Sequence, residues 1–373
     1  MIILGIETSC DETAVAVVED GKKILSNVVA TSLAKHAQTG GIIPEVAARE
    51  QVKCIIPVIK EALKQSLCPG GHSGEGLAAR KSSLAPNRSP LSPEIDAIAI
   101  TVGPGLIGSL LVGVETAKTL SYLWNKPIIP VNHLQGHIYA NWLSSPPYLI
   151  PDSEPTTHPH PQFPALALVV SGGHTELVLM KDHGKIEWLG GTRDDAAGEC
   201  FDKCARLLGL GYPGGPAISA EAGKGEGRSG KGEVKLPRPM MKEDNFDFSF
   251  SGLKTAVLRE VEKLDIAHNP KLIPTLAHEI QEAITDVLVA KTMRAAEKYK
   301  VKSILLAGGV AANSCLREKL HSPLLTSHFT HIPPPSLCTD NAAYIASCAF
   351  FNNHPKSWQE IRALPGLEIT DKV

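Results

Sequence analysis

The sequence predicts an α/β protein made of two similar lobes, and three observations favour this fold class. The chain has 373 residues, which at roughly 150 residues per domain is enough for two domains. Short β-branched runs alternate with longer runs of helical apolar spacing along the chain. The element order of the first half, three strands followed by a helix, a strand and a helix, recurs in the second half. An internal duplication explains this recurrence better than the loose matches that any mixed α/β protein yields.

In the first half, turn residues bound the apolar runs. An Asp-Gly pair at 20–21 is typical of a hairpin turn, and a Gly-Pro-Gly run at 103–105 ends a buried strand. A helix rich in small residues follows, through Ser109, Gly113 and Ala117. The predicted strands are Ile2–Glu7, Ala14–Glu19, Ile24–Thr31, Ile95–Thr101 and Pro127–Val131, and the first long helix is Glu45–Leu67.

The second half repeats this pattern with its own turns. A His-Gly pair at 183–184 predicts a second hairpin turn, and a Gly-Gly pair at 308–309 lies between a strand and a helix that begins near Asn313. The predicted strands are Ala165–Ser171, Thr175–Met180, Lys185–Leu189 and Ser303–Ala307, and the long amphipathic helix is Leu276–Tyr299.

These elements suggest where the lobes divide. We expect an N-terminal lobe over residues 1–130, completed by the C-terminal helix at about 340–373, and a C-terminal lobe over 131–339. Two stretches rich in Pro, Gly or Ser, 68–93 and 146–164, look like inserted loops.

Composition excludes several classes of protein. Hydrophobic residues make up 43% of the chain and charged residues 20%, which excludes a mainly disordered, collagen-like or coiled-coil chain. The net charge is only −2, so a generally basic nucleic-acid-binding surface is also excluded. The best local basic patch is Gly223–Lys242, with six basic and two acidic residues.

Cysteine usage and hydropathy predict a soluble, cytoplasmic protein. The eight cysteines are scattered and form no Cys-x-x-Cys pair, a pattern that favours reduced thiols over a disulfide framework. The sequence begins directly in a strand, with no basic and apolar leader. No run reaches about 18 uninterrupted apolar residues, so we expect no membrane span.

The sharpest local motif is His133-x-x-x-His137. Two histidines four residues apart on a helix share one face and suit a metal ion, and the pair directly follows a predicted strand end, where α/β folds bind ligands. Asp340 is the leading third ligand. Two imidazoles with one carboxylate favour Fe(II), with Zn(II) as the competitor. On local sequence alone, two unrelated histidines and a helix N-cap at Asp340 remain open alternatives.

A metallopeptidase is the rival interpretation of this motif. In His-Glu-x-x-His enzymes, the glutamate beside the first histidine activates the zinc-bound water. Residue 134 is leucine, so that general base is missing.

Three glycine-rich turns predict a nucleotide site. Glycine lets backbone N–H groups approach an anion, because no Cβ stands in the way. The turns lie at 171–175, 214–216 and 308–313, in the same half as Asp194, Asp195 and Asp202. The motifs of a P-loop and of a Rossmann dinucleotide site are absent from the sequence.

As an ordered set, the motifs resemble the TsaD family, the bacterial tRNA threonylcarbamoyladenosine transferases. The matching segments are Glu7-Thr8-Ser9-Cys10-Asp11-Glu12-Thr13, His133-x-x-x-His137, Ser171-Gly172-Gly173-His174-Thr175, Asp194-Asp195-Ala196-Ala197-Gly198-Glu199, Phe248-Ser249-Phe250-Ser251-Gly252-Leu253-Lys254, Gly308-Gly309-Val310-Ala311-Ala312-Asn313 and Thr339-Asp340-Asn341-Ala342.

The resemblance implies a duplicated actin/Hsp70/sugar-kinase-like (ASKHA) fold and an acyltransferase. Its donor would be threonylcarbamoyl-AMP, and its acceptor the adenosine 3′ of the anticodon in tRNAs that read codons beginning with A, with release of AMP. The implied partners are tRNA, a TsaB-like paralogue and a TsaE-like P-loop ATPase.

The resemblance also implies ligands by position. One divalent metal ion per chain would be held by His133, His137 and Asp340. The adenylate would be held by Val169, Val170, Ser171, Gly172, Gly173, Asp202, Gly215 and Asn313.

The sequence leaves the catalytic groups open. Asp11 and Glu12, at the first strand turn, are a general base or orienting groups, or else ordinary solvated turn carboxylates. Phe246, Phe248 and Phe250, beside the basic patch, would either stack on tRNA bases or, as we favour, mark a buried strand face. A non-catalytic scaffold of the same fold is a further alternative, and such a protein would be expected to lack the histidine pair.

Overall fold

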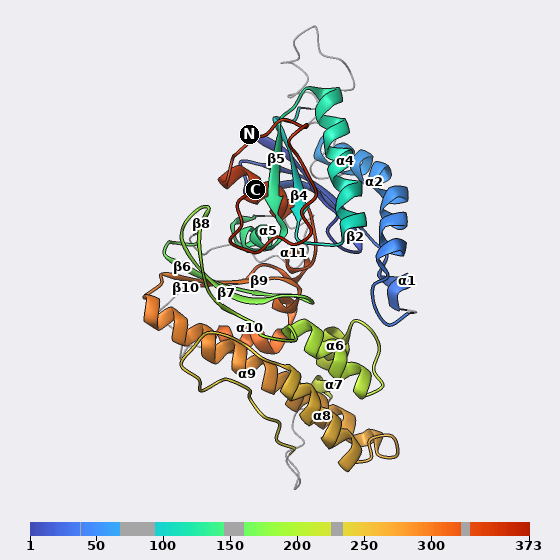
Figure 1. The fold of residues 1–373 in the computed structure, drawn as a ribbon, viewed down its shortest axis with the longest axis vertical. Helices are drawn as coiled ribbons and strands as arrows, with labels where there is room; N and C mark the ends of the chain where they lie inside the picture. Colours follow the sequence, from blue (N-terminus) through green and yellow to red (C-terminus); the bar gives the residue numbers. More distant parts are fainter. Residues whose placement is uncertain (38, 68–93, 145–159, 225–233, 322–328) are drawn as a thin grey trace. The chain divides into compact units, whose positions relative to one another are not determined.

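The computed structural model describes residues 1–37, 39–67, 94–144, 160–224, 234–321 and 329–373, and Figure 1 shows it as a ribbon. The chain divides into two compact units, Met1–His160 with Thr339–Val373, and Pro161–Cys338. This division lies beyond the boundary expected at residue 130, because the strand and helix that follow residue 127 pair and pack within the first unit. The loop-like stretch 68–93, and most of the stretch 146–164, lie outside the described residues.

The first unit is built on a five-stranded sheet in the order β3-β2-β1-β4-β5. The pairs β1–β2 and β2–β3 are antiparallel, whereas β1–β4 and β4–β5 are parallel. Its strands are β1 (Ile2–Glu7), β2 (Glu12–Glu19), β3 (Lys23–Thr31), β4 (Ala97–Gly103) and β5 (Ile128–Asn132). Its helices are α1 (Leu33–Ala37), α2 (Pro44–Leu67), α4 (Ile107–Trp124), α5 (His133–Tyr139), the 3₁₀ turn Ala140–Trp142 and α12 (Ala343–Phe351).

The central strand β1 is apolar up to its last residue, Glu7, because helices cover both faces of this sheet. Successive side chains of a strand point to opposite faces. Leu4 and Ile6 belong to the core that includes residues of α2 and α4, whereas Gly5 lies against the start of α12, where a Cβ would clash with the carbonyl oxygen of Ala342. The missing side chain at position 5 therefore lets α12 pack directly on the sheet.

The second unit repeats this topology. Its sheet has the order β10-β9-β6-β7-β8, with β6–β7 and β7–β8 antiparallel and β6–β9 and β9–β10 parallel. Counted outward from β1 and from β6, the two sheets have the same order and directions, so the predicted duplication is confirmed. The strands are β6 (Ala165–Val170), β7 (Thr175–Asp182), β8 (Lys185–Gly191), β9 (Ser303–Ala307) and β10 (Phe329–His331).

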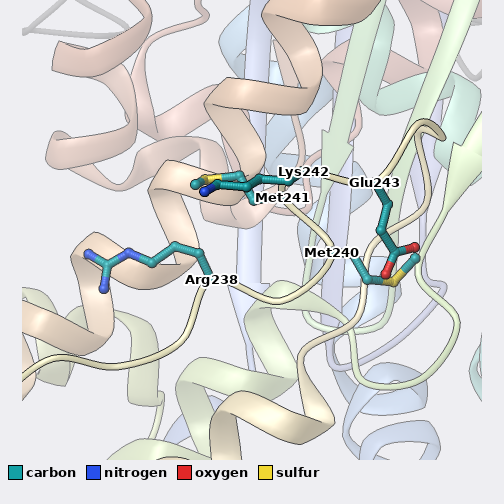
Figure 2. A pocket seen from close by; sticks show the side chains of 5 residues that line it. All are labelled: Arg238, Met240, Met241, Lys242 and Glu243. Carbon is teal, nitrogen blue, oxygen red and sulfur yellow. The ribbon is translucent and has the colours of Figure 1, made fainter.

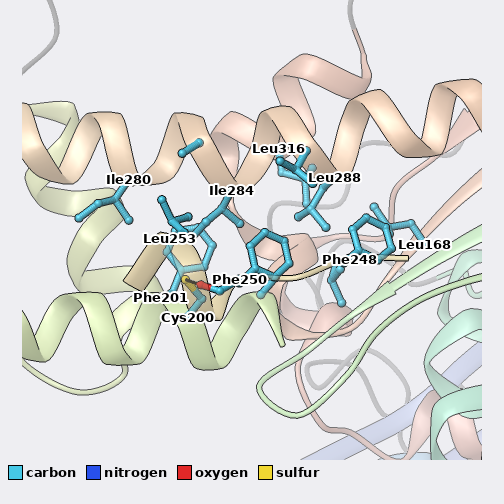
Figure 3. Close-up of a cluster of buried hydrophobic side chains, with 14 of the residues drawn as sticks. Leu168, Cys200, Phe201, Phe248, Phe250, Leu253, Ile280, Ile284, Leu288 and Leu316 are labelled. Atoms are coloured by element: carbon cyan, nitrogen blue, oxygen red, sulfur yellow. Dashed lines mark hydrogen bonds between the residues drawn. The ribbon is translucent and has the colours of Figure 1, made fainter. Parts of the chain in front are cut away.

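The core of the second unit gathers around the long helix α9 (Figure 3). Phe248 and Phe250 lie in this core beside Ile284 and Leu288 of α9. Phe246 is also buried, so the predicted burial of the three phenylalanines is confirmed and stacking on tRNA bases is excluded. The expected strand is wrong, because Phe248 makes only an isolated bridge to Thr192. The helices are α6 (Ala197–Leu207), α7 (Gly214–Gly223), α8 (Ser251–Lys263), α9 (Ile273–Tyr299), α10 (Ser314–Leu320), α11 (Pro335–Cys338) and the 3₁₀ turns Pro270–Leu272 and Gly309–Ala312.

None of the helices in the described ranges combines the length and the apolar character needed to cross a membrane.

Candidate metal centre

The two histidines of the sequence motif lie on the first turns of α5, directly after β5. The helix begins there because the side chain of Asn132 accepts hydrogen bonds from the backbone N–H groups of Leu134 and Gln135, at 3.0 and 3.4 Å, which is the usual role of an N-cap residue. His133 and His137 consequently lie one turn apart, with ring centroids separated by 4.6 Å.

Asp340 completes the group, as the sequence predicted. Its Oδ1 lies 3.2 Å from His137 Nε2 and 3.8 Å from His133 Nε2, and the three ligand atoms all lie within 4.8 Å of one another. The alternative N-cap role of Asp340 is wrong, because Asn341 Oδ1 accepts the hydrogen bonds from the N–H groups of Ala343 and Tyr344 instead.

The burial of these groups fits a metal ion. His137 is 1% exposed, and neither of its ring nitrogens makes an aligned hydrogen bond within the described residues. Buried polar atoms are normally satisfied, and an imidazole nitrogen beside a second imidazole and a carboxylate is the donor set that binds Fe(II) or Zn(II).

Burial and the nearby charges together shift the pKa values of the two histidines in opposite directions. Burial lowers the pKa of His133, but the carboxylates of Glu7 and Asp340 outweigh burial and raise it to about 9. For His137, burial is the largest effect and the pKa is lowered.

The carboxyl groups respond to the same charges. Burial opposes ionisation of Asp340, but the nearby histidines lower its pKa. Burial, followed by the charges of Asp340 and Asp11, raises the pKa of Glu12 to about 10. Asp11 is only 7% exposed, so the interpretation of this turn as solvated carboxylates is wrong.

Three side chains of this centre escaped the sequence analysis. Glu7 Oε2 lies 3.0 Å from His133 Nδ1, the Ser9 hydroxyl lies 3.3 Å from the same nitrogen, and Tyr344 donates to Asp340 Oδ1 over 3.4 Å. Two signals in the sequence point to two of them: Glu7 ends the otherwise apolar strand Ile2–Glu7, and Glu7 and Ser9 both lie in the segment 7–13 that resembles the TsaD family.

The predicted adenylate residues all lie in the second unit. Val169 and Val170 end β6 with fully buried side chains, so only their backbones are available to a ligand. The turn that follows approaches α6, because Gly198 N donates to the Ser171 carbonyl oxygen over 3.2 Å. Gly172 and Gly173 have open space where a Cβ would stand.

The other predicted adenylate residues border helix starts in the same unit. Asp202 accepts from the Gly214 N–H at 2.6 Å, and burial raises its pKa. Gly215 has open space at its Cβ position. Asn313 caps α10 through the Leu316 N–H and donates to Gln281 over 2.9 Å, so its side chain is already engaged within the protein.

The basic stretch Gly223–Lys242 is only partly available to a nucleic acid. Residues 225–233 lie outside the described residues, and Arg238 is paired with Glu279 and Asp286. A cavity of about 440 Å³ lies beside Arg238, Met240, Met241, Lys242 and Glu243 (Figure 2). The exposed basic side chains of the described part are Lys224, which is paired with Glu221, Lys235 and Lys242.

The duplicated sheets define the class of protein, which is that of the actin/Hsp70/sugar-kinase-like fold. The solved structure of full-length HypF in its phosphate- and nucleotide-bound form is similar over 94% of this chain and 46% of that chain, with a TM-score of 0.52 and 12% identity. HypF from T. kodakarensis gives the same TM-score and identity over 94% of this chain and 47% of that chain. At this identity the likeness shows the fold alone, and it confirms the predicted fold class.

Sequence comparison then identifies the family. The profile of TsaD, tRNA N6-adenosine threonylcarbamoyltransferase, matches residues 23–69 and 85–347. Proteins of that description from Thermomicrobium roseum and Dehalococcoides mccartyi are 49% and 47% identical, covering 94% and 99% of this chain and 92% and 100% of their own lengths. A relative from Bacillus thuringiensis is 45% identical over 99% of this chain and 96% of its own. The chain belongs to the TsaD family and is a transferase, which excludes the metallopeptidase and scaffold alternatives.

Proposed function

We propose that the protein transfers a threonylcarbamoyl group from threonylcarbamoyl-AMP to N6 of the adenosine 3′ of the anticodon, in tRNAs that read codons beginning with A. AMP is the second product. The observation that carries this proposal is the group formed by the buried His133 and His137 with the half-buried Asp340, whose ligand atoms lie within 4.8 Å of one another, in a chain of the TsaD family.

One divalent metal ion per chain would be held by these three residues. Two imidazoles and one carboxylate favour Fe(II), with Zn(II) as the competitor. When bound, such an ion supplies a Lewis acid that polarises a carbonyl oxygen.

The chain's own residues bind and orient the reactants. AMP is a good leaving group, so the transfer needs no nucleophilic side chain, and much of the rate enhancement comes from holding the tRNA amine against the donor. Asp11, buried in the turn after β1, and Glu12, half-buried at the start of β2, are the groups available to orient that amine or to accept its proton.

The glycine turns of the second unit would hold the adenylate. The proposed contacts are Val169, Val170, Ser171, Gly172, Gly173, Asp202, Gly215 and Asn313. The open space at Gly172, Gly173 and Gly215 supports this assignment, because backbone N–H groups without a neighbouring Cβ can approach a phosphate closely.

Partners are proposed on the same basis. A TsaB-like paralogue and a TsaE-like ATPase would assist the transfer in the cytoplasm. The small residues of α4 do not face a partner, since Ser109 and Ala117 are fully buried and a Cβ at Gly113 would clash with Thr8. The apolar side chains left exposed on the two neighbouring helices α2 and α4 are better candidates for a partner contact, among them Val52, Ile56, Ile107 and Leu111.

The test is reconstitution of the transfer. Purified protein is incubated with threonylcarbamoyl-AMP, cognate tRNA and the two helper proteins, and the tRNA is digested and analysed for threonylcarbamoyladenosine by mass spectrometry. We expect the modified nucleoside with the wild type and little with His133→Ala. A tRNA carrying guanosine at the target position is the matched control. Absence of product with the wild type, or equal product with His133→Ala, would contradict the proposal.

A further inference from the structure

A fully buried carboxylate lies at the end of β1, behind the proposed metal ligands. Glu7 is 0% exposed and follows five residues of an apolar strand. Burying a charged group is costly unless hydrogen bonds and neighbouring charges compensate for the lost water. The partners of Glu7 therefore show what the residue does.

Both oxygens of Glu7 are engaged by donors from separate parts of the first unit. The Ser9 backbone N–H donates to Oε1 at 2.5 Å, and the Thr101 hydroxyl of β4 donates to Oε2 at 2.6 Å. These two contacts fix the carboxylate in one position. They leave Oε2 free to accept one more hydrogen bond, from His133 Nδ1 at 3.0 Å.

This contact determines which ring nitrogen of His133 carries the proton. A carboxylate only accepts hydrogen bonds, so His133 must carry hydrogen on Nδ1 to make the contact. In the neutral ring, Nε2 then keeps its lone pair, and Nε2 is the atom that lies 3.8 Å from Asp340 Oδ1. Metal-binding histidines are commonly held in this way, by a carboxylate on the nitrogen that does not bind the metal.

We propose that Glu7 is a positioning residue of the metal centre, which holds His133 in the orientation and tautomer that present Nε2 to a divalent metal ion. This inference rests on the proposed metal-binding role of His133, His137 and Asp340. Glu7 itself does not touch the metal or the substrates.

Ser9 is the competing candidate for the same role. Its hydroxyl lies 3.3 Å from His133 Nδ1, and a hydroxyl can either donate to or accept from that nitrogen. Ser9 therefore does not specify the tautomer, whereas Glu7 does. This difference makes Ser9→Ala the matched control for Glu7→Gln.

The experiment measures metal affinity in the full-length protein. Fe(II), under anaerobic conditions, and Zn(II) are titrated into metal-free protein against a competing chelator. We expect Glu7→Gln to weaken binding about 10- to 100-fold, the usual effect of losing an outer partner of a metal-bound histidine. A glutamine side chain has the same shape but can also donate to Nδ1, so it no longer selects one tautomer. Ser9→Ala should bind within about threefold of the wild type, because its contact is long.

A second readout separates positioning from general destabilisation. Nitrogen-15 NMR of histidine-labelled, metal-free protein, recorded near pH 10 where the His133 ring is neutral and with the His133 resonance assigned by its loss in His133→Ala, reports the tautomer directly. We expect a protonated Nδ1 in the wild type and in Ser9→Ala, and a mixture in Glu7→Gln. If Glu7→Gln does not fold, Thr101→Val decides, since it removes the hydroxyl that fixes the Glu7 carboxylate against His133 without replacing either residue.

Each outcome supports or overturns the inference. Wild-type affinity in the folded Glu7→Gln variant, or in Thr101→Val if that variant must decide, overturns it and leaves the proposed function standing. An effect of Ser9→Ala equal to that of Glu7→Gln also overturns it. If the wild-type protein binds neither metal, the metal centre and the role of Glu7 fail together.

Discussion

The two units share one topology, but the ligand sites that we propose at the turn after their first strands would be built by opposite means. After β1, the turn presents side chains: Glu7 and Asp11 are buried there, and the metal-ligand group lies in the same unit. After β6, the corresponding turn has glycines at 172 and 173, with open space where side chains would stand. The first unit thus offers carboxylates and imidazoles, and the second offers exposed backbone.

The glycine-rich turns before the crossover helices differ in the same sense. Before α4, Cβ atoms at Gly103 and Gly105 would meet the carbonyl oxygens of Leu364 and Ser9, so the protein itself fills that turn. Before α10, a Cβ at Gly308 would also meet a carbonyl oxygen, that of Val170, but Gly309 has open space at its Cβ position, so this turn is filled at only one of its two glycines. Under the proposed function, one fold would support a site made of side chains in one copy and a site made of backbone in the other, according to how far the chain itself fills each turn.

The largest effect should come from removing a metal ligand in the first unit. We expect His137→Ala to weaken metal binding by more than about 100-fold, since losing a ligand exceeds the 10- to 100-fold effect of losing an outer partner. AMP binding, which we assign to the second unit, should change less than about threefold. Metal analysis and calorimetry with AMP measure the two effects, and His268→Ala, at an exposed histidine of the second unit, is the control. Equal loss of both ligands would break the assignment of one site to each unit.

Alanine at paired glycines tests whether a turn is filled or open. We expect Gly103→Ala to lower the free energy of unfolding by about 2–4 kcal/mol, because the new Cβ meets the Leu364 carbonyl oxygen and overpacking and backbone strain add. Gly173→Ala should lower the free energy of unfolding by less than about 1 kcal/mol. The same substitution should weaken AMP binding about tenfold, which is about 1.4 kcal/mol of binding free energy. Urea unfolding and calorimetry measure these quantities. A Gly173→Ala variant that is as unstable as Gly103→Ala would show that the second turn is also filled.

A smaller effect should follow from the contacts between α5 and the C-terminal segment. Gln135, between the two histidines, donates to the carbonyl oxygens of Ile369 and Asp371 at 2.8 and 3.2 Å, and Asn132 donates to that of Glu368 at 2.8 Å. We expect Gln135→Ala to weaken metal binding about 2- to 10-fold, the value of a lost hydrogen bond or two. Gln65→Ala, at a side chain of α2 that contacts Glu61 of its own helix, should leave the affinity unchanged. Unchanged affinity in Gln135→Ala would show that the segment does not hold the centre.

The sequence predicted the strands better than the helices, for a physical reason. Apolar, β-branched runs bounded by glycine define buried strands, and Ile2–Glu7 and Ser303–Ala307 match the structure at both ends. The helix α6 was missed because its buried residues, although they recur at helical spacing, are mostly the small residues Ala, Gly and Cys.

The metal centre was predictable only in part. The spacing of His133 and His137 predicts a metal site, whereas Glu7 contacts His133 from a position 126 residues away in the chain. No local pattern records such a contact, and it exists only once β1 and β5 are placed in the same sheet.

The last prediction concerns a buried charge of the second unit that serves structure rather than ligand binding. Lys291 of α9 is fully buried and donates to the carbonyl oxygen and side chain of Asn245 at 3.1 Å each. Burial, followed by the charge of Arg294, lowers its pKa to about 8 from the ordinary value near 10.5. Between these two values the folded protein has released the proton while the unfolded chain still holds it, so stability rises with pH in this window.

Replacing Lys291 should remove that rise. We expect the free energy of unfolding of the wild type, measured in urea, to increase relative to that of Lys291→Met between about pH 8 and pH 10, and to run parallel below pH 8, where both states are protonated. Lys302→Met, at an exposed lysine of the same unit, should follow the wild type throughout. Parallel curves for all three proteins would show that Lys291 is not held in a desolvated environment. Lys291 would then not be the structural buried charge that we contrast with the buried carboxylates Glu7 and Asp11 of the first unit.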